Sequence, residues 1–288
     1  MTENPFLAVI GGSGLYSFPA LSNVNSIEVD TPYGKPSSPI VIGSLSGRKV
    51  AFLARHGIGH ILMPSEVNYR ANIYALKSIG VQRVVSISAC GSLREEYSPG
   101  NIVIPDQLVD LTRGRPRTFF GEGIVVHVGV ADPYCEELRR YVLNAVQKTG
   151  AVVHNGGTYI TIDGPRFSTK AESQLYRQWK MSIIGMTAIP EVFLAREAEL
   201  CYATMAHVTD YDVWHVSEEP VTVDMVLKVL HQNTEIAQRS IQNLVEMLPD
   251  KTECDCKNAL RNAILTQSDY IPVETRKKVS LFVDKYLK

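Results

Sequence analysis

The stretch from Met181 to Trp214 reads MSIIGMTAIPEVFLAREAELCYATMAHVTDYDVW. Ser182–Met186 is a short apolar run, which predicts a buried strand. Glu191–Glu199 has helical character, and Leu200–Val208 is a second apolar run that includes Tyr, Thr and Val. This order predicts a strand–helix–strand unit, the building block of an α/β fold.

Small polar or acidic residues follow both predicted strands. Met186-Thr187 follows the first and Thr209–Asp212 follows the second. In open α/β sheets, ligands bind outside the carboxyl ends of the strands. Asp210 and Asp212 are two residues apart and could both face a ligand there. They could equally cap a helix or form a turn, and the spacing alone leaves both interpretations open.

Composition restricts the class of protein. The chain has 288 residues, of which 45% are hydrophobic, and a formal net charge of −1. Neither general attraction to nucleic acid nor attraction to an anionic membrane is expected from this charge. No apolar run is long enough to span a membrane, and the N-terminus does not read as a signal peptide. We therefore expect a globular cytoplasmic protein. No linker, repeat or low-complexity tract divides it, which predicts one α/β domain over residues 1–288, with 250–288 a helical C-terminal extension.

Five cysteines do not form a disulfide scaffold in a chain of this length. Cys254 and Cys256 form a C-x-C pair near the C-terminus. A single pair without two further ligands nearby is weak evidence for zinc. We expect two reduced surface thiols, with a strained disulfide or a redox role as the alternatives.

Two segments near the N-terminus could bind an anion. Gly11–Gly14, which contains Ser13, follows an apolar strand, and such a glycine turn lets N–H groups and a hydroxyl approach an anion. Arg55 and His56 follow another strand, and a guanidinium suits phosphate or carboxylate. A metal site at His56 and His60 is the rival interpretation, but Gly57 and Gly59 argue against the helix it would need. A plain turn and a solvated loop also remain open, and no metal ligand set is predicted.

The sequence also allows structural predictions for three later segments. Thr112–Gly123 is basic and aromatic, but it is short in a nearly neutral chain, so we expect a surface or subunit-contact loop. Val125–Val130 reads as an apolar strand, in which His127 is expected to be a core residue. Asp132-Pro133 predicts the start of an amphipathic helix that ends near Thr149.

Six motifs in one order resemble the trimeric purine nucleoside phosphorylases, and within that family the branch that acts on 5′-methylthioadenosine. The resemblance extends from about Leu7 to about Leu230. The motifs are Ile10–Leu15, Arg55-His56-Gly57 with His60, Met63-Pro64 with Val67–Asn72, Ala89–Glu96, Ile162–Ser168 and Met186–Glu191. The resemblance implies a nucleoside phosphorylase-like fold, with a central mixed, twisted β-sheet flanked by helices.

The resemblance also implies a reaction. Inorganic phosphate attacks C1′ of the nucleoside with inversion, which releases adenine and 5-methylthioribose 1-phosphate. The transition state resembles an oxocarbenium ion, so the enzyme needs a phosphate cradle and a proton donor at purine N7. No cofactor is expected, since phosphate is a co-substrate.

Residue by residue, the family pattern assigns the site. The phosphate cradle corresponds to Ser13, Arg55, His56, Ser88, Ala89 and Thr187. Met186 would lie along the ribose and Phe167 beside the base. The apolar wall for the 5′ group corresponds to Val223 and Leu227. His60 matches a position on the same side, and His127 matches a residue that a neighbouring subunit contributes, which implies a homotrimer.

The base-binding end corresponds to Asp210, Asp212 and Ser168. We expect Asp210 to be the leaving-group acid, with a raised pKa, and Asp212 to accept from the 6-amino group. In related 6-oxopurine enzymes an Asn and a Glu stand where this chain has Asp210 and Ser168, which favours 6-aminopurines. Because the two carboxyl groups are coupled, their roles could be exchanged.

Two alternative functions remain open at this stage. After about Leu230 the chain departs from the animal enzymes, and Cys254–Leu260 is similar to a microbial branch with broader purine choice. Some members of that branch carry a C-x-C disulfide. A phosphorylase that prefers inosine, guanosine or methylthioinosine is therefore one alternative, and a non-catalytic nucleoside-binding protein is the other.

Overall fold

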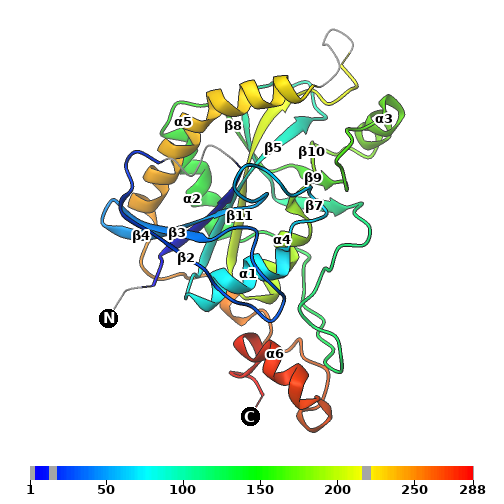
Figure 1. The fold of residues 1–288 in the computed structure, drawn as a ribbon. Coiled ribbons are helices and arrows are strands. Elements are labelled where there is room, and N and C mark those ends of the chain that lie inside the picture. Colours follow the sequence, from blue (N-terminus) through cyan, green and yellow to red (C-terminus); the bar gives the residue numbers. More distant parts are fainter. Residues whose placement is uncertain (1–3, 13–17, 216–221, 288) are drawn as a thin grey trace.

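The computed structural model describes residues 4–12, 18–215 and 222–287. Figure 1 shows strands in the middle of the molecule and helices around them. The strands are β1 (Leu7–Gly11), β2 (Ser22–Ile27), β3 (Ile40–Leu45), β4 (Arg48–Ala54), β5 (Arg83–Ser92), β6 (Ile102–Ile104), β7 (Gln107–Asp110), β8 (Val153–Asn155), β9 (Thr158–Thr161), β10 (Ile183–Gly185) and β11 (Cys201–Asp210). The α-helices are α1 (Tyr69–Ser78), α2 (Glu136–Gln147), α3 (Lys170–Gln178), α4 (Ala188–Glu197), α5 (Val223–Met247) and α6 (Val273–Val283).

All of these strands belong to one mixed sheet, with β5 at its centre. The sheet runs β2-β3-β4-β1-β5-β10-β9-β7, and β11, β6 and β8 branch from β5. β5 is parallel to β1 and β11 but antiparallel to β10. The predicted mixed sheet flanked by helices is therefore confirmed.

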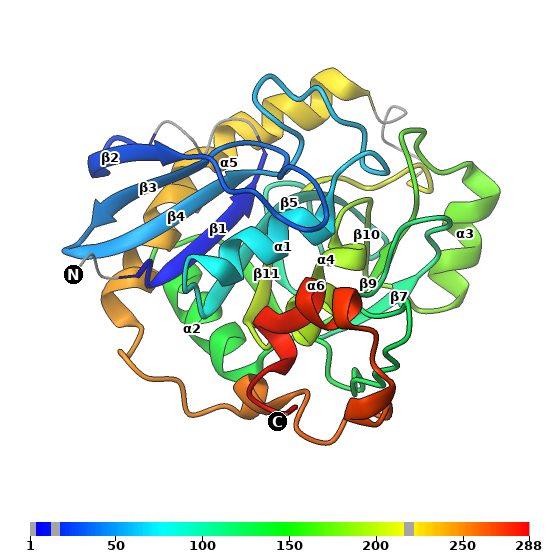
Figure 2. The same cartoon turned by 60° about the horizontal axis from the view of Figure 1, so that its bottom comes forward.

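Helices cover the sheet on both faces, and alternation along the strands creates a core on each. In β1, Ala8 and Ile10 pack with α1, α4 and α6, whereas Leu7 and Val9 pack with α2 and α5. In Figure 2, α1, α4 and α6 lie in front of the strands and α5 lies behind them. Within the described residues, no helix is long and apolar enough to cross a membrane.

The predicted strand–helix–strand unit is present as β10, α4 and β11. Both strands flank β5, with Ile184 opposite Gly91 on one side and Asp210 opposite Gly91 on the other. The ends of three strands therefore meet at Gly91. The predicted hairpin of Val41–Leu45 and Lys49–Ala54 is also present as β3 and β4.

Two predicted boundaries were wrong for local reasons. The helix expected from Asp132-Pro133 begins at Glu136, because Cys135 is its N-cap and accepts a hydrogen bond from the N–H of Leu138. Val125–Val130 is not a strand. It makes an isolated bridge from Val126 to Ile264, and its His127 is exposed rather than buried in a core.

Thr112–Gly123 is not the simple surface loop that its composition suggested. Arg115 and Phe119 are 5% and 3% exposed. The ring of Phe119 packs 4.5 Å from that of Phe282 on α6. The loop thus joins the C-terminal extension to the rest of the fold. That extension is less helical than expected, since α6 is preceded by short 3₁₀ turns at Asp255–Asn258 and Ser268–Tyr270.

Candidate active site

A cavity of about 320 Å³ opens where β5, β10 and β11 end, a volume typical of small-molecule sites. Twelve of the fifteen residues that the sequence assigned to a site line it: Arg55, His56, His60, Ser88, Ala89, Phe167, Ser168, Met186, Thr187, Asp210, Asp212 and Val223. Ser13 and the side chain of Leu227 lie outside the described residues, and His127 is exposed and does not line it.

Arg55 occupies one end of the cavity and is held by a buried ion pair. Its Nε and Nη2 donate to the carboxylate of Glu191 at 2.8 and 2.9 Å, and Nη2 also donates to Ser86 Oγ at 2.7 Å. Both partners are almost fully buried, with Arg55 2% and Glu191 0% exposed. Burial alone would lower the pKa of Arg55, but the Glu191 carboxylate outweighs burial and raises it. The guanidinium is therefore a permanent cation.

Few N–H groups of Arg55 remain free to donate to a ligand. Nη1 donates to the carbonyl oxygen of Ile87 at 3.1 Å, and that is its single acceptor among the described residues. A guanidinium nitrogen carries two N–H groups, so one N–H of Nη1 can bind an anion. The contribution of Arg55 to anion binding is thus one directed hydrogen bond and a fixed positive charge, rather than a bidentate fork.

His56 is adjacent to Arg55 and is neutral. Burial, followed by the nearby charge of Arg55, lowers the pKa of His56 to about 4. Its Nδ1 lies 2.9 Å from the carbonyl oxygen of Leu62, which can only accept, so Nδ1 carries the proton. Nε2 is then an acceptor, able to bind a protonated oxygen of phosphate. The ring also stacks on His60 at 4.3 Å.

Arg55 contacts β5 at Ile87, and two buried carboxyl groups line the cavity further along that strand, beside Gly91. Asp210 accepts from Thr209 Oγ1 at 2.6 Å and from the N–H of Asp212 at 2.7 Å. Burial raises the pKa of Asp210 to about 6. Burial also raises the pKa of Asp212, while the hydroxyls of Ser173 and Ser168 oppose this rise. The two residues therefore form a turn, closed by the Asp210 carboxylate, and both also line the cavity.

Gly91 makes room for this pair of carboxyl groups. A Cβ atom at position 91 would lie 2.9 Å from Asp210 Oδ1, 3.1 Å from Ile184 Cγ2 and 3.3 Å from Asp212 Cβ. β10 and the end of β11 thus approach the β5 backbone more closely than a side chain at position 91 would permit.

Apolar side chains line the cavity between its two polar ends. Met186 and Phe167 lie on the loops after β10 and β9, and Val223 is the first residue of α5. Phe167 and Val223 are still 37% and 61% exposed. Such a surface can contact a sugar, a planar base and an apolar substituent.

The comparisons with known proteins agree on one family. A model of the Phosphorylase superfamily matches residues 6–246. The chain is 53% identical over 280 residues to the S-methyl-5'-thioadenosine phosphorylase of Koribacter versatilis (strain Ellin345), covering 97% of this chain and 96% of the relative. The chain belongs to the S-methyl-5'-thioadenosine phosphorylase family.

Solved structures of family members have the same fold. A methylthioadenosine phosphorylase from an antarctic soil metagenomic library superposes with a TM-score of 0.93 at 46% identity, over 97% of this chain and 99% of that one. A mutant of the adenosine/methylthioadenosine phosphorylase of Schistosoma mansoni, in complex with methylthioadenosine, superposes with a TM-score of 0.83 at 36% identity, over 89% and 96%. The recognition of the family from sequence motifs is confirmed.

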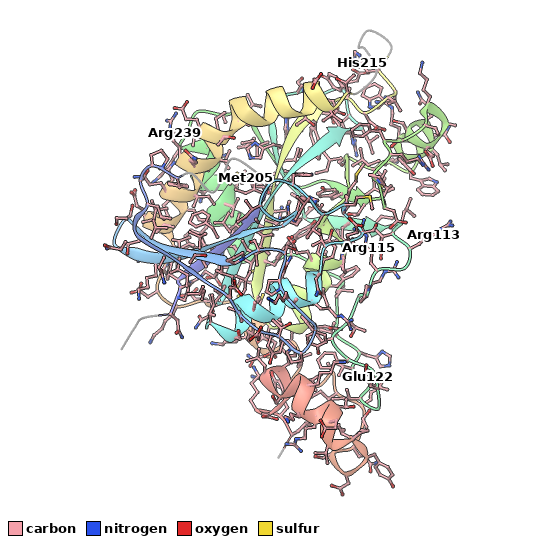
Figure 3. The ribbon with its side chains drawn as sticks, viewed as in Figure 1. Arg113, Arg115, Glu122, Met205, His215 and Arg239 are labelled. Atoms are coloured by element: carbon pink, nitrogen blue, oxygen red, sulfur yellow. The ribbon has the colours of Figure 1, made fainter. Side chains whose placement is uncertain are left out.

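Arg115, which the sequence did not single out, does not line the cavity but holds two of its loops. Its Nη1 donates to the carbonyl oxygens of Met186 and Ile189, both at 2.7 Å, and its Nη2 donates to that of Asp163 at 2.8 Å. Figure 3 shows Arg115 further inside the molecule than its neighbour Arg113. Arg115 therefore fixes the two loops that carry Met186 and Phe167. The sequence shows three arginines in this loop, but composition alone does not tell which of them is buried.

His207 and Glu191 were also not assigned a role from sequence. His207 on β11 lines the cavity, is 1% exposed, and neither ring nitrogen has a hydrogen-bond partner among the described residues. Burial lowers its pKa to about 4, so the ring is neutral. Glu191 is a motif residue of the family, and its burial against Arg55 explains why it is needed.

Glu191→Gln is expected to destabilise this phosphorylase fold strongly. The substitution keeps the shape of the side chain but leaves the buried Arg55 charge unpaired, which should cost about 3–5 kcal/mol. Urea unfolding measures the loss. Arg166→Gln is the matched control, since it breaks the exposed Arg166–Glu172 pair, a type of interaction worth at most about 1 kcal/mol. Equal losses in the two variants would contradict a special role for the buried pair.

Proposed function

We propose that the chain catalyses phosphorolysis of 5′-methylthioadenosine to adenine and 5-methylthioribose 1-phosphate, as a step in salvage of methionine and purines. The observation that carries the proposal is the polarity of the cavity. A buried cation lies at one end, two buried carboxyl groups lie at the other, and apolar side chains lie between them. The names of the relatives support the same substrate.

The chemistry requires this separation of charge. A phosphate oxygen forms a bond to C1′ while the C1′–N9 bond breaks, and the electron pair of that bond goes to the purine. The sugar is positively charged in the transition state, and the departing purine needs a proton at N7. Bound phosphate stabilises the sugar charge, and no cofactor enters the reaction.

Phosphate fits the end of the cavity that contains Arg55. One Nη1–H of Arg55 and the hydroxyls of Ser88 and Thr187 can donate to it, and the Thr187 side chain lies directly before α4. His56 Nε2 can accept from the protonated oxygen of HPO₄²⁻. Arg55 is pinned by Glu191, so its position does not change when phosphate binds.

The purine fits the carboxyl end. A neutral Asp210 can donate its proton to N7, and its raised pKa keeps a usable fraction protonated near neutral pH. Asp212 can accept from the 6-amino group. Both oxygens of Asp210 already accept hydrogen bonds, so the carboxyl group is held in place for this transfer.

A homotrimer with shared active sites is part of the proposal, as is a cytoplasmic location. The side of the cavity near His60 is open, and Ile58 and Ile61 beside it are 71% and 74% exposed. His127 is exposed and lies on the surface rather than in its own cavity. An adjacent subunit that covers the isoleucines and contributes His127 would complete the 5′ side.

The pure protein is expected to release adenine from 5′-methylthioadenosine only when phosphate is present. Adenine is followed by chromatography with and without phosphate. Turnover of methylthioinosine or inosine but not of 5′-methylthioadenosine would keep the phosphate end and reject the assignment of Asp210 and Asp212. Binding without turnover of any of these nucleosides would reject catalysis.

Asp210→Asn is expected to lower kcat/KM for 5′-methylthioadenosine about 10²- to 10⁴-fold, because the general acid is lost. In the unmodified enzyme, kcat/KM should fall as pH rises through about 6, since the protonated form of Asp210 is the active one and disappears in that range. In the variant, kcat/KM should not show this fall with pH, and substrate preference should shift toward methylthioinosine.

The exposed Asp224→Asn, on the same helix as Val223, is the control and should retain the activity and the pH profile. An Asp210→Asn variant with an unchanged pH limb would show that another group donates the proton.

Shared active sites predict complementation between two inactive variants. His127→Ala and Asp210→Asn are each expected to impair the enzyme, but co-expression should form mixed trimers. Over all trimers formed by random assembly of equal amounts, about a quarter of the sites would combine an intact Asp210 with an intact His127 from the neighbour. Activity near that fraction of the unmodified enzyme is expected. Activity no higher than the average of the separate variants would mean that each subunit uses its own His127 or none.

A further inference from the structure

Four cysteines from distant parts of the sequence meet at the end of the sheet opposite the active site. Cys135 caps α2, Cys201 is the first residue of β11, and Cys254 and Cys256 belong to the C-terminal extension. Their sulfur atoms all lie within 4.8 Å of one another. Cys201 Sγ lies 3.2 Å from Cys254 Sγ. The expectation of two surface thiols is therefore wrong for Cys256, which is buried. Cys135 and Cys201 supply the two further thiols that the sequence does not place near the C-x-C pair.

Hydrogen bonds from backbone N–H groups hold Cys135 and Cys254 in this arrangement. The N–H of Cys135 donates to the carbonyl oxygen of Tyr202, which ties the start of α2 to the start of β11. Glu137 Oε2 accepts from the N–H of Glu253 and the N–H of Cys254 at 2.9 and 2.6 Å. The first turn of α2 thus binds the segment that carries the C-x-C pair. The cluster is a built feature rather than a chance approach of side chains.

Groups that can oppose negative charge lie near these sulfur atoms. Cys135 Sγ accepts from the N–H of Leu138 at 3.5 Å, in the first turn of α2, where the helix dipole stabilises negative charge. Arg196 Nη1 lies 3.6 Å from Cys256 Sγ. Arg83, which is 2% exposed, is the register partner of Cys201 on β5.

We propose that Cys135, Cys201, Cys254 and Cys256 bind one zinc ion. Tetrahedral zinc with Zn–S bonds of about 2.3 Å needs sulfur atoms roughly 3.8 Å apart, and the present separations lie on both sides of that value, so only small shifts are needed. Each thiol that ligates the ion releases its proton, and the resulting complex has a net charge of −2. Arg83 and Arg196 oppose that charge. Two adjacent disulfides could also place four sulfurs together, but a single four-coordinate ion binds all four thiolates at once.

The zinc ion would be structural and not catalytic. Cys201 and Asp210 lie at opposite ends of β11, about 30 Å apart for an extended strand of this length. The ion joins the sheet, α2 and the extension that leads to α6. The inference does not rest on the proposed function, since a zinc site at the start of β11 is independent of the reaction catalysed at the end of β11. It adds a structural metal to a chain that the sequence predicted to be metal-free.

Metal analysis of the full-length protein tests the proposal. The protein is purified under reducing conditions without chelators, and zinc is measured by mass spectrometry. About one zinc per chain is expected, falling below about 0.1 in Cys254→Ser and in Cys256→Ser. Cys90→Ser changes the remaining cysteine, which lies outside the cluster, and should keep the full zinc content.

Two further measurements make the result decisive even if the serine variants fail to fold. Cobalt(II) exchanged into the unmodified protein should show the sulfur-to-metal charge-transfer and d–d bands of a tetrahedral thiolate site. Alkylation of the unfolded, unreduced protein counts free thiols after zinc is removed, and five are expected. No zinc with only one or three alkylated thiols would replace the proposal with disulfides. No zinc with five alkylated thiols would leave a packed thiol cluster and equally overturn it.

Discussion

The buried ion pair of Arg55 and Glu191 is the interaction on which the rest of the structure depends. It joins the residue that follows β4 to α4, and its hydrogen bonds extend to Ser86 and Ile87 on β5. Tyr202 on β11 donates to the same carboxylate. Neither charge can be removed alone, because the other would then be left uncompensated in the core. The pair therefore fixes one helix and three strands around a positive charge that faces the cavity.

A second consequence of burial is that the two ends of the cavity have opposite electrostatic character. Near Arg55, burial keeps His56 neutral, so the phosphate end combines a single permanent cation with neutral hydrogen-bonding groups. Near Gly91, burial instead disfavours the negative charge of Asp210 and Asp212. The same physical effect thus removes charge from a base at one end and from an acid at the other. A neutral acid beside the purine and a fixed cation beside the phosphate are what the phosphorolysis mechanism requires.

β11 connects this chemistry to the stability of the chain's C-terminal part. Its last residue, Asp210, faces the cavity, while its first residue, Cys201, meets the cysteines of α2 and of the extension. The extension also packs through Phe282 against the loop that contains Arg115. Arg115 fixes the loops after β9 and β10. Packing of the extension against the Arg115 loop therefore also supports the loops of the active site.

The sequence by itself determined the α/β class, the β10–α4–β11 unit, the family and a set of site residues, most of which line the cavity. It could do so because these features depend on local apolar patterns and on contiguous motifs at strand ends. Only the tertiary structure decided that Arg55 is largely occupied by Glu191, that Arg115 is buried among the substrate loops, and that His127 lies on the surface. The same holds for the four cysteines, of which the sequence shows only the C-x-C pair as neighbours. These facts depend on which strands and loops become adjacent when the sheet forms, and pairing over such sequence distances leaves no local pattern to detect.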